Sequence, residues 1–301
     1  METRAKLLVL GSLNLDLVLH VPRMPAAGET LASDASATFC GGKGANQAVA
    51  CARMGAAVSM IGRIGDDPAG AMLRTALTDE GIDPAGVVVT EGVASGTAAI
   101  LLTPDGQNRI ILAAGANGRV SPRDVAAQAT LFESAHMLVC QLEVPLETVE
   151  AATTLAASLG VRVLLNPAPA RLLPPELLAR VDYLVPNESE AAALTGIDVR
   201  DVASATEAAL VLRGQGVGVV VITLGASGIL IADARGSRHM RALPTDVVDT
   251  TAAGDSFIGG FAAGLAEGMD IDAAAQLGLR VARLCVARAG AQASLPRRDE
   301  L

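Results

Sequence analysis

Apolar positions follow two alternating patterns along most of this chain. Short runs rich in β-branched residues are typical of buried strands, and longer Ala-rich segments have the period of a helix. The predicted strands are Val9–Gly11, Val58–Ile61, Met137–Val139, Val161–Leu165, Tyr183–Val185 and Val217–Thr223. The predicted helices are Ala45–Met54, Gly70–Asp79, Leu146–Leu159, Ala203–Arg213, Ser256–Glu267 and Ile271–Ala287. This alternation predicts an α/β fold, a three-layer sandwich in which helices cover both faces of a mostly parallel central sheet.

Two stretches, at about 13–39 and 94–112, interrupt the alternation. Each has short alternating segments with Pro and Gly turns, and neither has a helical pattern. We expect them to form a small antiparallel β lid over the carboxyl edge of the main sheet, where open α/β sheets bind ligands. Ordinary surface loops are the alternative. Because no Pro/Ser-rich linker divides the chain, we expect a single domain over residues 1–301 with this lid inserted in it.

Composition narrows the classes of function. Of the 301 residues, 51% are hydrophobic, which excludes a disordered chain. The formal net charge is −9 and only 2% of residues are aromatic, so we expect no nucleic-acid partner. The uncharged segment Gly214–Ala232 has a turn at Gly225–Gly228 and is interpreted as two buried strands, with no membrane span. The four dispersed cysteines predict free buried thiols and a cytoplasmic protein.

The segment Gly41–Gln47, Gly-Gly-Lys-Gly-Ala-Asn-Gln, contains the first candidate chemistry. Its glycines allow the backbone to approach a ligand closely, and a helix that starts near Ala45 offers unpaired N–H groups. Lys43 and Asn46 add polar side chains. A purely structural glycine-rich helix start is equally compatible with this spacing, and the segment does not fit the Walker A pattern.

A second candidate site lies at 249–257, between a strand-like region at Arg241–Val248 and the helix predicted from Ser256. Small residues at 252–254 leave backbone N–H groups free to surround an anion. Asp255 stands next to them, and its structural interpretation is a helix N-cap. A carboxylate beside an anion site is otherwise suited to accept a proton from a nucleophile that attacks a phosphoryl group.

Further motifs follow one another in a fixed order. The full series is Gly11–Asp16, Gly41–Gln47, Gly65–Asp67, Gln141–Glu143, Asn166–Ala170, Pro186–Glu190, Thr223–Gly225, Asp249–Phe257 and Gly290–Ser294. In order and spacing, and over essentially the whole chain, it resembles the ribokinase, or PfkB, family of sugar kinases. The resemblance implies a ribokinase-like fold and phosphoryl transfer from ATP to a sugar.

The resemblance also implies a sugar site and a catalytic group. The residues implied to hold the sugar are Asn14, Asp16, Gly42, Lys43, Asn46 and Glu143. Asp255 would be the base for the sugar's 5-hydroxyl, and the catalytic anion hole would be the backbone of Ala252, Ala253 and Gly254. Without the resemblance, Asp16 is interpreted as a strand-end or turn residue.

The nucleotide side is implied by two more motifs. Asn187 and Glu190 match the family's Asn-x-x-Glu, which helps to place Mg²⁺ and phosphates through water, although Asn187 alone is interpreted as a helix cap. The other residues implied to bind ATP are Thr223, Gly225, Ala226, Ser227, Gly228 and Gly254. An activating K⁺ is implied beside the anion hole, with ligands that are mostly backbone carbonyls, at Asp249, Thr251, Cys285, Arg288 and Gly290, with Ser294 close by.

The implied reaction is ATP-dependent phosphorylation of D-ribose at its 5-hydroxyl, which gives D-ribose 5-phosphate and ADP. Asn14 together with Asp16 favours a sugar with both ring hydroxyls, but a deoxyribokinase or a fructokinase stays open, as does a non-catalytic sugar sensor. A Rossmann dehydrogenase is excluded, because Gly11-Ser12-Leu13-Asn14 stands where Gly-x-Gly-x-x-Gly would follow the first strand. Apolar strand edges in the lid predict a homodimer joined through it.

Overall fold

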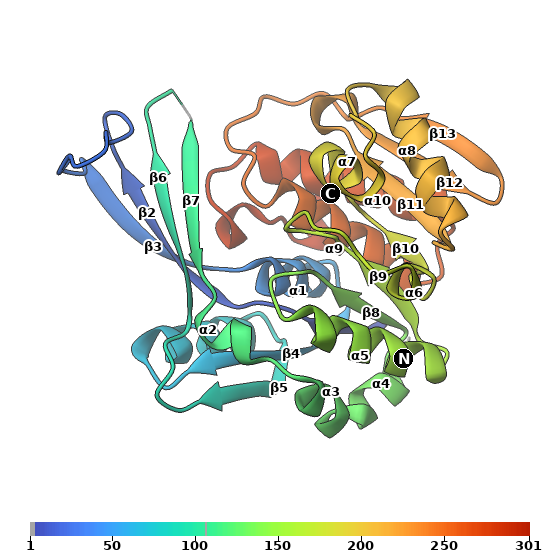
Figure 1. The fold of residues 1–301 in the computed structure, drawn as a ribbon, viewed down its shortest axis with the longest axis horizontal. Coiled ribbons are helices and arrows are strands. Elements are labelled where there is room, and N and C mark those ends of the chain that lie inside the picture. The colour runs from blue at the N-terminus through green and yellow to red at the C-terminus, as the bar shows by residue number, and fades with distance from the viewer. Residues whose placement is uncertain (1–3, 106) are drawn as a thin grey trace.

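The computed structural model describes residues 4–105 and 107–301, whose strands form two sheets (Figure 1). The main sheet has the order β13-β12-β11-β10-β9-β8-β1-β4-β5. Its strands are β1 (Lys6–Leu10), β4 (Ala57–Gly65), β5 (Asp83–Thr90), β8 (Met137–Cys140), β9 (Arg162–Leu165), β10 (Tyr183–Leu184), β11 (Val219–Thr223), β12 (Ile229–Asp233) and β13 (Gly236–Met240). Every neighbouring pair is parallel except the two that include β12. The predicted, mostly parallel sheet is confirmed.

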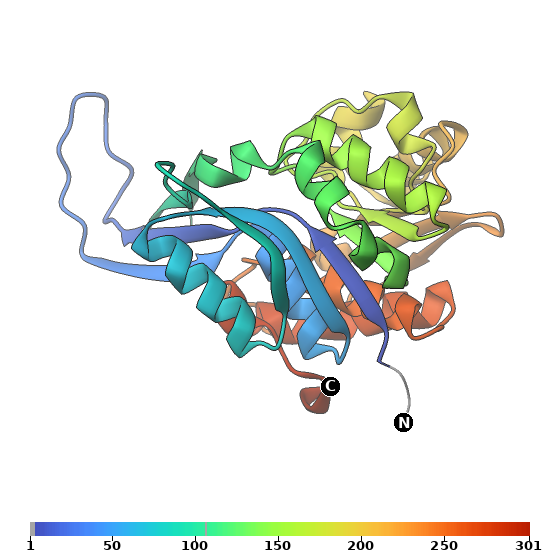
Figure 2. The same cartoon turned by 90° about the horizontal axis from the view of Figure 1, so that it is seen from below.

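Helices cover both faces of this sheet, because its strands are apolar on both sides. In β1, Leu7 and Val9 pack into one core cluster, while Leu8 and Leu10 pack into the other. One face is covered by α1 (Lys43–Arg53), α2 (Pro68–Asp79), α9 (Ala253–Ala266) and α10 (Ile271–Val286). The other face is covered by α3 (Pro122–Ala127), α4 (Ala129–Ser134), α5 (Leu146–Ser158), α6 (Pro175–Leu178), α7 (Glu188–Thr195) and α8 (Val202–Gly214) (Figure 2). This arrangement is the expected three-layer sandwich. Over residues 4–105 and 107–301, none of the helices combines the length and the apolar character that a membrane crossing needs.

The region after β11 differs in part from the sequence prediction. The turn at Gly225–Gly228 is present as the short helix η2 (Gly225–Ser227), between β11 and β12. The predicted strand at Arg241–Val248 is wrong, since the last strand of the sheet, β13, ends at Met240. Pro244 lies in the middle of that segment, and a proline cannot donate a backbone hydrogen bond to a neighbouring strand.

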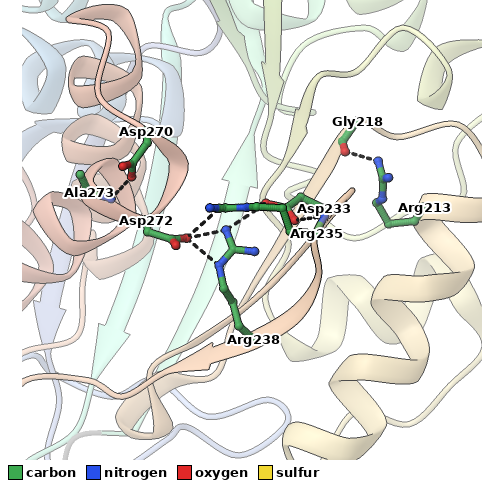
Figure 3. Close-up of polar contacts among 8 residues, drawn as sticks. All are labelled: Arg213, Gly218, Asp233, Arg235, Arg238, Asp270, Asp272 and Ala273. Carbon is green, nitrogen blue, oxygen red and sulfur yellow. Dashed lines mark hydrogen bonds and ion pairs between the residues drawn. The ribbon is translucent and has the colours of Figure 1, made fainter.

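A cluster of ion pairs holds the β12–β13 hairpin against the first turn of α10 (Figure 3). Arg238 Nε donates to Asp272 Oδ1 (2.6 Å), and its guanidinium lies 2.9 Å from Asp233. Arg235 contacts the same two carboxylates, at 3.3 Å for Asp233 and 3.2 Å for Asp272. Asp270 caps α10 from the same side. The hairpin leads directly into the 241–252 segment, so this cluster fixes the start of that segment relative to α10.

The second sheet is built from the two stretches that lack a helical pattern. In the order β3-β2-β6-β7, its strands are β2 (Asn14–His20), β3 (Ala35–Gly41), β6 (Gly96–Leu102) and β7 (Asn108–Ala113). β2 pairs antiparallel with β3, and β6 with β7, while a parallel pairing of β2 with β6 joins the two hairpins. The expected small antiparallel sheet is thus present, with one parallel junction. Figure 1 shows it standing out from one side of the main body.

All four cysteines are free, as predicted. Cys51, Cys140 and Cys285 are buried. Cys40 departs from the prediction of burial, because it lies on β3 at an edge of the small sheet and is half-buried.

Candidate active site

Most predicted site residues lie at or beyond the carboxyl ends of neighbouring strands. The order of the main sheet reverses at β1, which has β8 on one side and β4 on the other. Asn14 follows β1, Glu143 follows β8, Asn187 follows β10, and Thr223 is the last residue of β11. Open α/β sheets bind ligands at such a reversal, so the topology gathers side chains that are distant in sequence.

The glycine-rich segment packs tightly against the start of β2. Gly42 has a φ of 88°, and a Cβ at this position would lie 2.8 Å from the backbone nitrogen of Asn14. A Cβ on Gly41 would collide with the Asp16 carboxylate. Helix α1 then starts at Lys43. The glycines therefore have a structural role, and this role brings the start of α1 next to the polar side chains of β2.

A cavity of about 330 Å³ is lined by Asn14 and Glu143, two residues predicted to hold the sugar. One oxygen of Glu143, Oε2, is already engaged. It accepts hydrogen bonds from Ser12 Oγ (2.5 Å) and from the backbone N–H of Lys43 (3.2 Å). These two donors orient the carboxylate and leave its other oxygen for a ligand.

Asp16, on β2, carries a buried carboxylate oxygen, Oδ1, that makes no hydrogen bond with the described residues. Burial and the nearby carboxylates of Glu143 and Asp255 raise the pKa of Asp16 to about 7. A buried acceptor without a partner is costly unless a ligand supplies the donor. Asp16 is therefore suited to accept hydrogen bonds from hydroxyl groups.

A second cavity, of about 190 Å³, joins residues predicted for the sugar, the nucleotide and catalysis. Its lining is Lys43, Asn166, Val185, Asn187, Glu190, Thr223, Thr250, Ala252, Ala253, Gly254, Asp255 and Ile258. Burial opposes the charged form of Lys43, but the carboxylates of Asp255, Glu143 and Glu190 outweigh it and raise the pKa of the ammonium. The cavity thus has one firmly protonated cation and a helix start in its wall, a combination suited to an anionic ligand.

The residues of the predicted anion hole lie at the N-cap and in the first turn of α9. Ala252 has a φ of 60°, the left-handed region, which costs a residue with a Cβ about 1 kcal/mol or more. The N–H of Ala253 donates to the Thr250 carbonyl at 3.2 Å, so it is partly engaged. Around Gly254, the space that a Cβ would take has no heavy atom within 4 Å. The N–H groups of Ala252 and Gly254 donate to none of the described residues, so these two positions can donate to an anion.

The Asp255 carboxylate is buried, with 7% exposure, and both oxygens are held by amides of α1. Asn46 Nδ2 donates to Oδ2 (3.1 Å), and Gln47 Nε2 donates to Oδ1 (2.9 Å). Its interpretation as a helix N-cap is wrong, because the N-cap of α9 is Ala252 and Asp255 lies inside the first turn. The side chain lines the 190 Å³ cavity, where a proton acceptor is chemically useful.

A network of buried amides continues from Asp255 toward α7. Gln47 Nε2 also contacts Asn166 Oδ1 (3.2 Å), and Gln47 Oε1 accepts from Gln141 Nε2 (2.6 Å). Asn166 Nδ2 lies 3.5 Å from Glu190 Oε2. Glu190 in turn accepts from the backbone N–H of Asn187 (2.9 Å) and from its Nδ2 (3.1 Å). The network connects the candidate base with the Asn-x-x-Glu motif.

Asn187 and Glu190 fit a magnesium ion that arrives with phosphates. Asn187 is the N-cap of α7, and Glu190 completes a capping box, so the structural interpretation of Asn187 is confirmed. Burial is the main cause that raises the pKa of Glu190. Among the described residues there is no cluster of three or more His, Cys, Asp or Glu that could enclose a metal. Asn187 Oδ1 already accepts from Ser189 Oγ and the Glu190 N–H, and both Glu190 oxygens accept from Asn187, so the pair suits contact with Mg²⁺ through the waters that this ion keeps.

The structure does not bring the whole predicted nucleotide segment to this cavity. Thr223 belongs to the lining, and the turn that follows it contains the other predicted positions. The positions outside the lining are Gly225, Ala226, Ser227 and Gly228.

The six residues predicted for K⁺ come from two segments that meet. Asp249 Oδ1 accepts from the N–H of Thr251 (2.8 Å), and its Oδ2 accepts from the N–H of Gly290 (2.9 Å). Cys285 Sγ lies 3.7 Å from the Thr251 carbonyl and 3.1 Å from Ser294 Oγ. The other predicted position is Arg288. Within the described residues, the carbonyls of 249, 288 and 290 accept no hydrogen bond and are the oxygens that fit a hard monovalent cation, whereas the Cys285 carbonyl accepts from the Arg288 N–H (3.0 Å).

Sequence reasoning assigned no role to several residues that orient the site. They are Ser12, Gln47, Asn117, Gln141 and Asn166, and all five are fully or almost fully buried. Four of them lie within the quoted motifs, and a polar residue in such a position is a signal for a buried partner. Asn117 lies outside every motif, and the sequence offers no sign of its contacts.

The match to a family model decides the assignment of the chain. The sequence matches the model for pfkB family carbohydrate kinases over residues 4–298. The chain belongs to this family. It is therefore a phosphotransferase of the carbohydrate kinase type, and the resemblance seen in its motifs is confirmed.

Individual relatives agree with this family. The chain is 42% identical to a ribokinase from Haemophilus influenzae, over 99% of this chain and 97% of that protein. It is 37% identical to a deoxyribokinase from Salmonella typhimurium, over 96% of this chain and 94% of the relative. Its structure is similar to that of an Arabidopsis thaliana ribokinase complexed with ribose and ATP, with a TM-score of 0.91, 31% identity and coverage of 99% of this chain and 97% of that one.

Proposed function

We propose that this protein transfers the terminal phosphoryl group of ATP to the 5-hydroxyl of D-ribose and so forms D-ribose 5-phosphate and ADP. The observation that carries the proposal is the Asp255 carboxylate, which is buried, held by two amides of α1, and placed in one cavity with Lys43 and the first turn of α9. The similarity to ribokinases, one of them complexed with ribose and ATP, supports this choice of substrates.

The proposed chemistry follows from the groups in that cavity. The 5-hydroxyl oxygen forms a bond to the γ-phosphorus while its proton passes to Asp255, and the bond from the γ-phosphorus to the bridging oxygen breaks, so that ADP leaves with the electron pair. The N–H of Gly254 and the ammonium of Lys43 stabilise the negative charge of the transferred group. Mg²⁺, held near Asn187 and Glu190 with the phosphates, would neutralise part of their charge.

In the proposed function, the sugar lies on the side of Asp255 that faces away from the ATP phosphates. Asn14, Asp16, Gly42, Lys43, Asn46 and Glu143 surround it. The turn at 223–228 borders the nucleotide. K⁺ bound between the 249–251 and 285–294 segments would stabilise the loop that leads into α9, because both segments would supply ligands to the same ion.

A deoxyribokinase activity is the second candidate, favoured by the 37% identity to such an enzyme. The deciding experiment measures kcat/KM with ATP for D-ribose, 2-deoxy-D-ribose and D-fructose. We expect D-ribose to exceed 2-deoxy-D-ribose by at least about 10-fold, because a missing hydroxyl leaves buried polar groups unpaired. We expect D-fructose to be poorer as well, because its additional carbon has to fit into the same buried site. A preference for 2-deoxy-D-ribose would overturn the substrate assignment, and sugar binding without ATP turnover would favour a sensor.

The assembly proposed is a homodimer formed through the small sheet. Its edge strand β7 exposes Ile110, Ile111 and Leu112, and its other edge strand, β3, exposes Phe39. Large exposed apolar residues on sheet edges favour pairing with a second copy. The four free thiols support a reducing compartment, and we propose the cytoplasm.

A further inference from the structure

Asn117 makes three hydrogen bonds at the start of β2 and is almost fully buried, with 1% exposure. It lies in the short helix η1 (Gly115–Arg119), which follows β7. Its Oδ1 accepts from the backbone N–H of Leu13 (2.9 Å), and its Nδ2 donates to the Leu13 carbonyl (3.0 Å) and to Asn14 Oδ1 (2.8 Å). The full hydrogen-bonding capacity of the Asn117 NH₂ group is used on this short segment.

The backbone of Leu13 determines which way both amides face. A backbone N–H can only donate and a carbonyl can only accept, so the oxygen and nitrogen of Asn117 cannot exchange places. Its second Nδ2 hydrogen then faces the side chain of Asn14, where only the Asn14 oxygen can accept it. The reversed Asn14 amide would place N–H against N–H. The main-chain atoms of Leu13 thus determine, through Asn117, which atom of the Asn14 amide is the oxygen and which is the nitrogen.

The packing leaves no space for another arrangement. A Cβ on Gly96, the first residue of β6, would collide with both the Asn117 nitrogen and the Asn14 oxygen. Asn14 and Asn117 also line the 330 Å³ cavity together with Glu143. Among the described residues, nothing accepts a hydrogen bond from the remaining group, the Asn14 NH₂.

We propose that Asn117 is a positioning residue that makes Asn14 a hydrogen-bond donor to the sugar. This inference rests on the proposed function, in which Asn14 and Asp16 bind sugar hydroxyls. Asn14 and Asp16 are two residues apart on β2, so their side chains lie on the same face of the strand, and this face carries a donor, Asn14 Nδ2, and an acceptor, the Asp16 carboxylate. A hydroxyl can accept from one and donate to the other, whereas a hydrogen in its place leaves both unpaired. Asn117 would therefore contribute to selection of hydroxylated over deoxy sugars without contacting the substrate.

The test is a double-mutant cycle with Asn14→Ala and Asn117→Ala, read as KM and kcat for D-ribose and KM for ATP. We expect Asn117→Ala to raise the KM for D-ribose about 10-fold, the effect of one lost hydrogen bond, while the KM for ATP changes less than about 2-fold. In the Asn14→Ala background the same change should add less than about 2-fold, because the residue acts through Asn14. Effects that multiply would overturn the inference.

Two more variants distinguish a positioning role of Asn117 from a general loss of stability. Asn14→Asp keeps the oxygen that Asn117 contacts and replaces the donor with an acceptor, so the KM for D-ribose should rise at least about 10-fold; an unchanged KM would overturn the donor assignment. Thr148→Val is the matched control, since Thr148 is fully buried and donates to the Val120 carbonyl (2.9 Å) just after η1. It should lower the Tm and leave the sugar KM unchanged.

The same measurements distinguish this inference from the proposed function. If the unmodified protein phosphorylates none of D-ribose, 2-deoxy-D-ribose and D-fructose, the proposed function fails and the inference falls with it. If the protein is active and the cycle shows independent effects of residues 14 and 117, the inference alone fails.

Discussion

Asp255 Oδ1 lies 2.9 Å from Gln47 Nε2, a contact that joins α9, which carries the proposed base, to α1. The orientation of Gln47 is determined by its neighbour Asn166, whose Nδ2 donates to the Val185 carbonyl (2.9 Å) and whose Oδ1 therefore faces Gln47. Gln47 must present its NH₂ group to both Asn166 and Asp255. The Val185 carbonyl, just after β10, thus determines through Asn166 and Gln47 that an N–H group faces Asp255, the proposed base.

Gln47→Leu tests whether this contact positions the base. The apolar side chain leaves Oδ1 of Asp255 without a donor and lets the carboxylate rotate, so kcat should fall about 10-fold or more while the KM for ATP changes little. Thr153→Val is the control, since Thr153 is equally buried but donates within α5, to the Glu150 carbonyl. Loss of stability without loss of kcat in Gln47→Leu would show that the contact is only structural.

The charged variant Gln47→Glu gives a second measurement of the same relationship. A carboxylate at position 47 removes the amide donor to Asp255 Oδ1 and places a second negative charge beside it. We expect kcat to fall at least as far as in Gln47→Leu, while the KM for ATP changes little. A kcat equal to that of the unmodified protein would mean that the donor from residue 47 does not position the proposed base.

Asp255→Asn tests the base itself. The substitution keeps the size of the side chain and removes the proton acceptor, so we expect kcat to fall about 10²–10⁴-fold. Because Asn46 and Gln47 both donate to residue 255, the new NH₂ group meets a donor, and the Tm should also drop slightly. ATP binding, measured by calorimetry, should persist. Turnover near that of the unmodified protein would remove Asp255 from its proposed role.

The raised pKa of Asp16, about 7, predicts a pH-dependent sugar affinity. Above pH 7 the carboxylate is ionised and can accept from sugar hydroxyls; below it, the added proton competes with them. The kcat/KM for D-ribose should therefore rise with pH up to about 7 and then level. Substitution of Glu143 by Gln removes one of the charges that raise this pKa, so the rise should occur at lower pH.

The same shift predicts a stability effect in the protein without sugar. The folded-state pKa of about 7 lies above 3.8, the usual pKa of an aspartate in an unfolded chain, so the folded state binds more protons between these pH values. Stability should fall as pH rises through this window and stay lower above it. Asp16→Asn removes the buried charge, and its Tm should exceed that of the unmodified protein by about 2 °C or more at pH 8, with a smaller difference at pH 5. An equal difference at both pH values would contradict this account.

The sequence predicted most strands of the main sheet, because buried parallel strands are continuous apolar runs, but it did not predict the edge strands β5 and β13. It also singled out polar residues after these strands that line the two cavities. It was wrong for Arg241–Val248, where apolar residues lie in a loop beside the site. It also missed Asn117, whose partners Leu13 and Asn14 lie more than 100 residues away. Such contacts depend on the return of the chain after β7 to the start of β2, and no local pattern encodes that return.

Asp249 offers a test of the cation site. Its carboxylate holds the N–H groups of Thr251 and Gly290, and these hydrogen bonds outweigh burial and lower its pKa. Asp249→Ala should separate the two segments, so that the K⁺ concentration for half-maximal activity rises about 10-fold or more while the KM for D-ribose stays within about 2-fold. Asp246→Ala, an exposed position of the same segment, is the control. Equal activity of the unmodified protein in K⁺, Na⁺ and choline salts would overturn the proposed site.

The proposed homodimer depends on β7, whose residue Ile111 is 68% exposed while its neighbour Ile110, on the opposite face of the strand, is 54% exposed. Consecutive strand residues point to opposite faces, so β7 exposes an apolar side chain on each face of the small sheet. A second copy that packs there would bury apolar area on both faces. Ile111→Lys adds a charge where the partner would lie and disturbs little of the monomer, because the residue has few neighbours to lose. Sedimentation at micromolar protein should shift from dimer to monomer. Leu210→Lys, on α8 and 57% exposed, should leave the dimer intact. A monomeric unmodified protein at this concentration would contradict the assembly, and dissociation by both variants would show that added charge, and not the position on β7, is responsible.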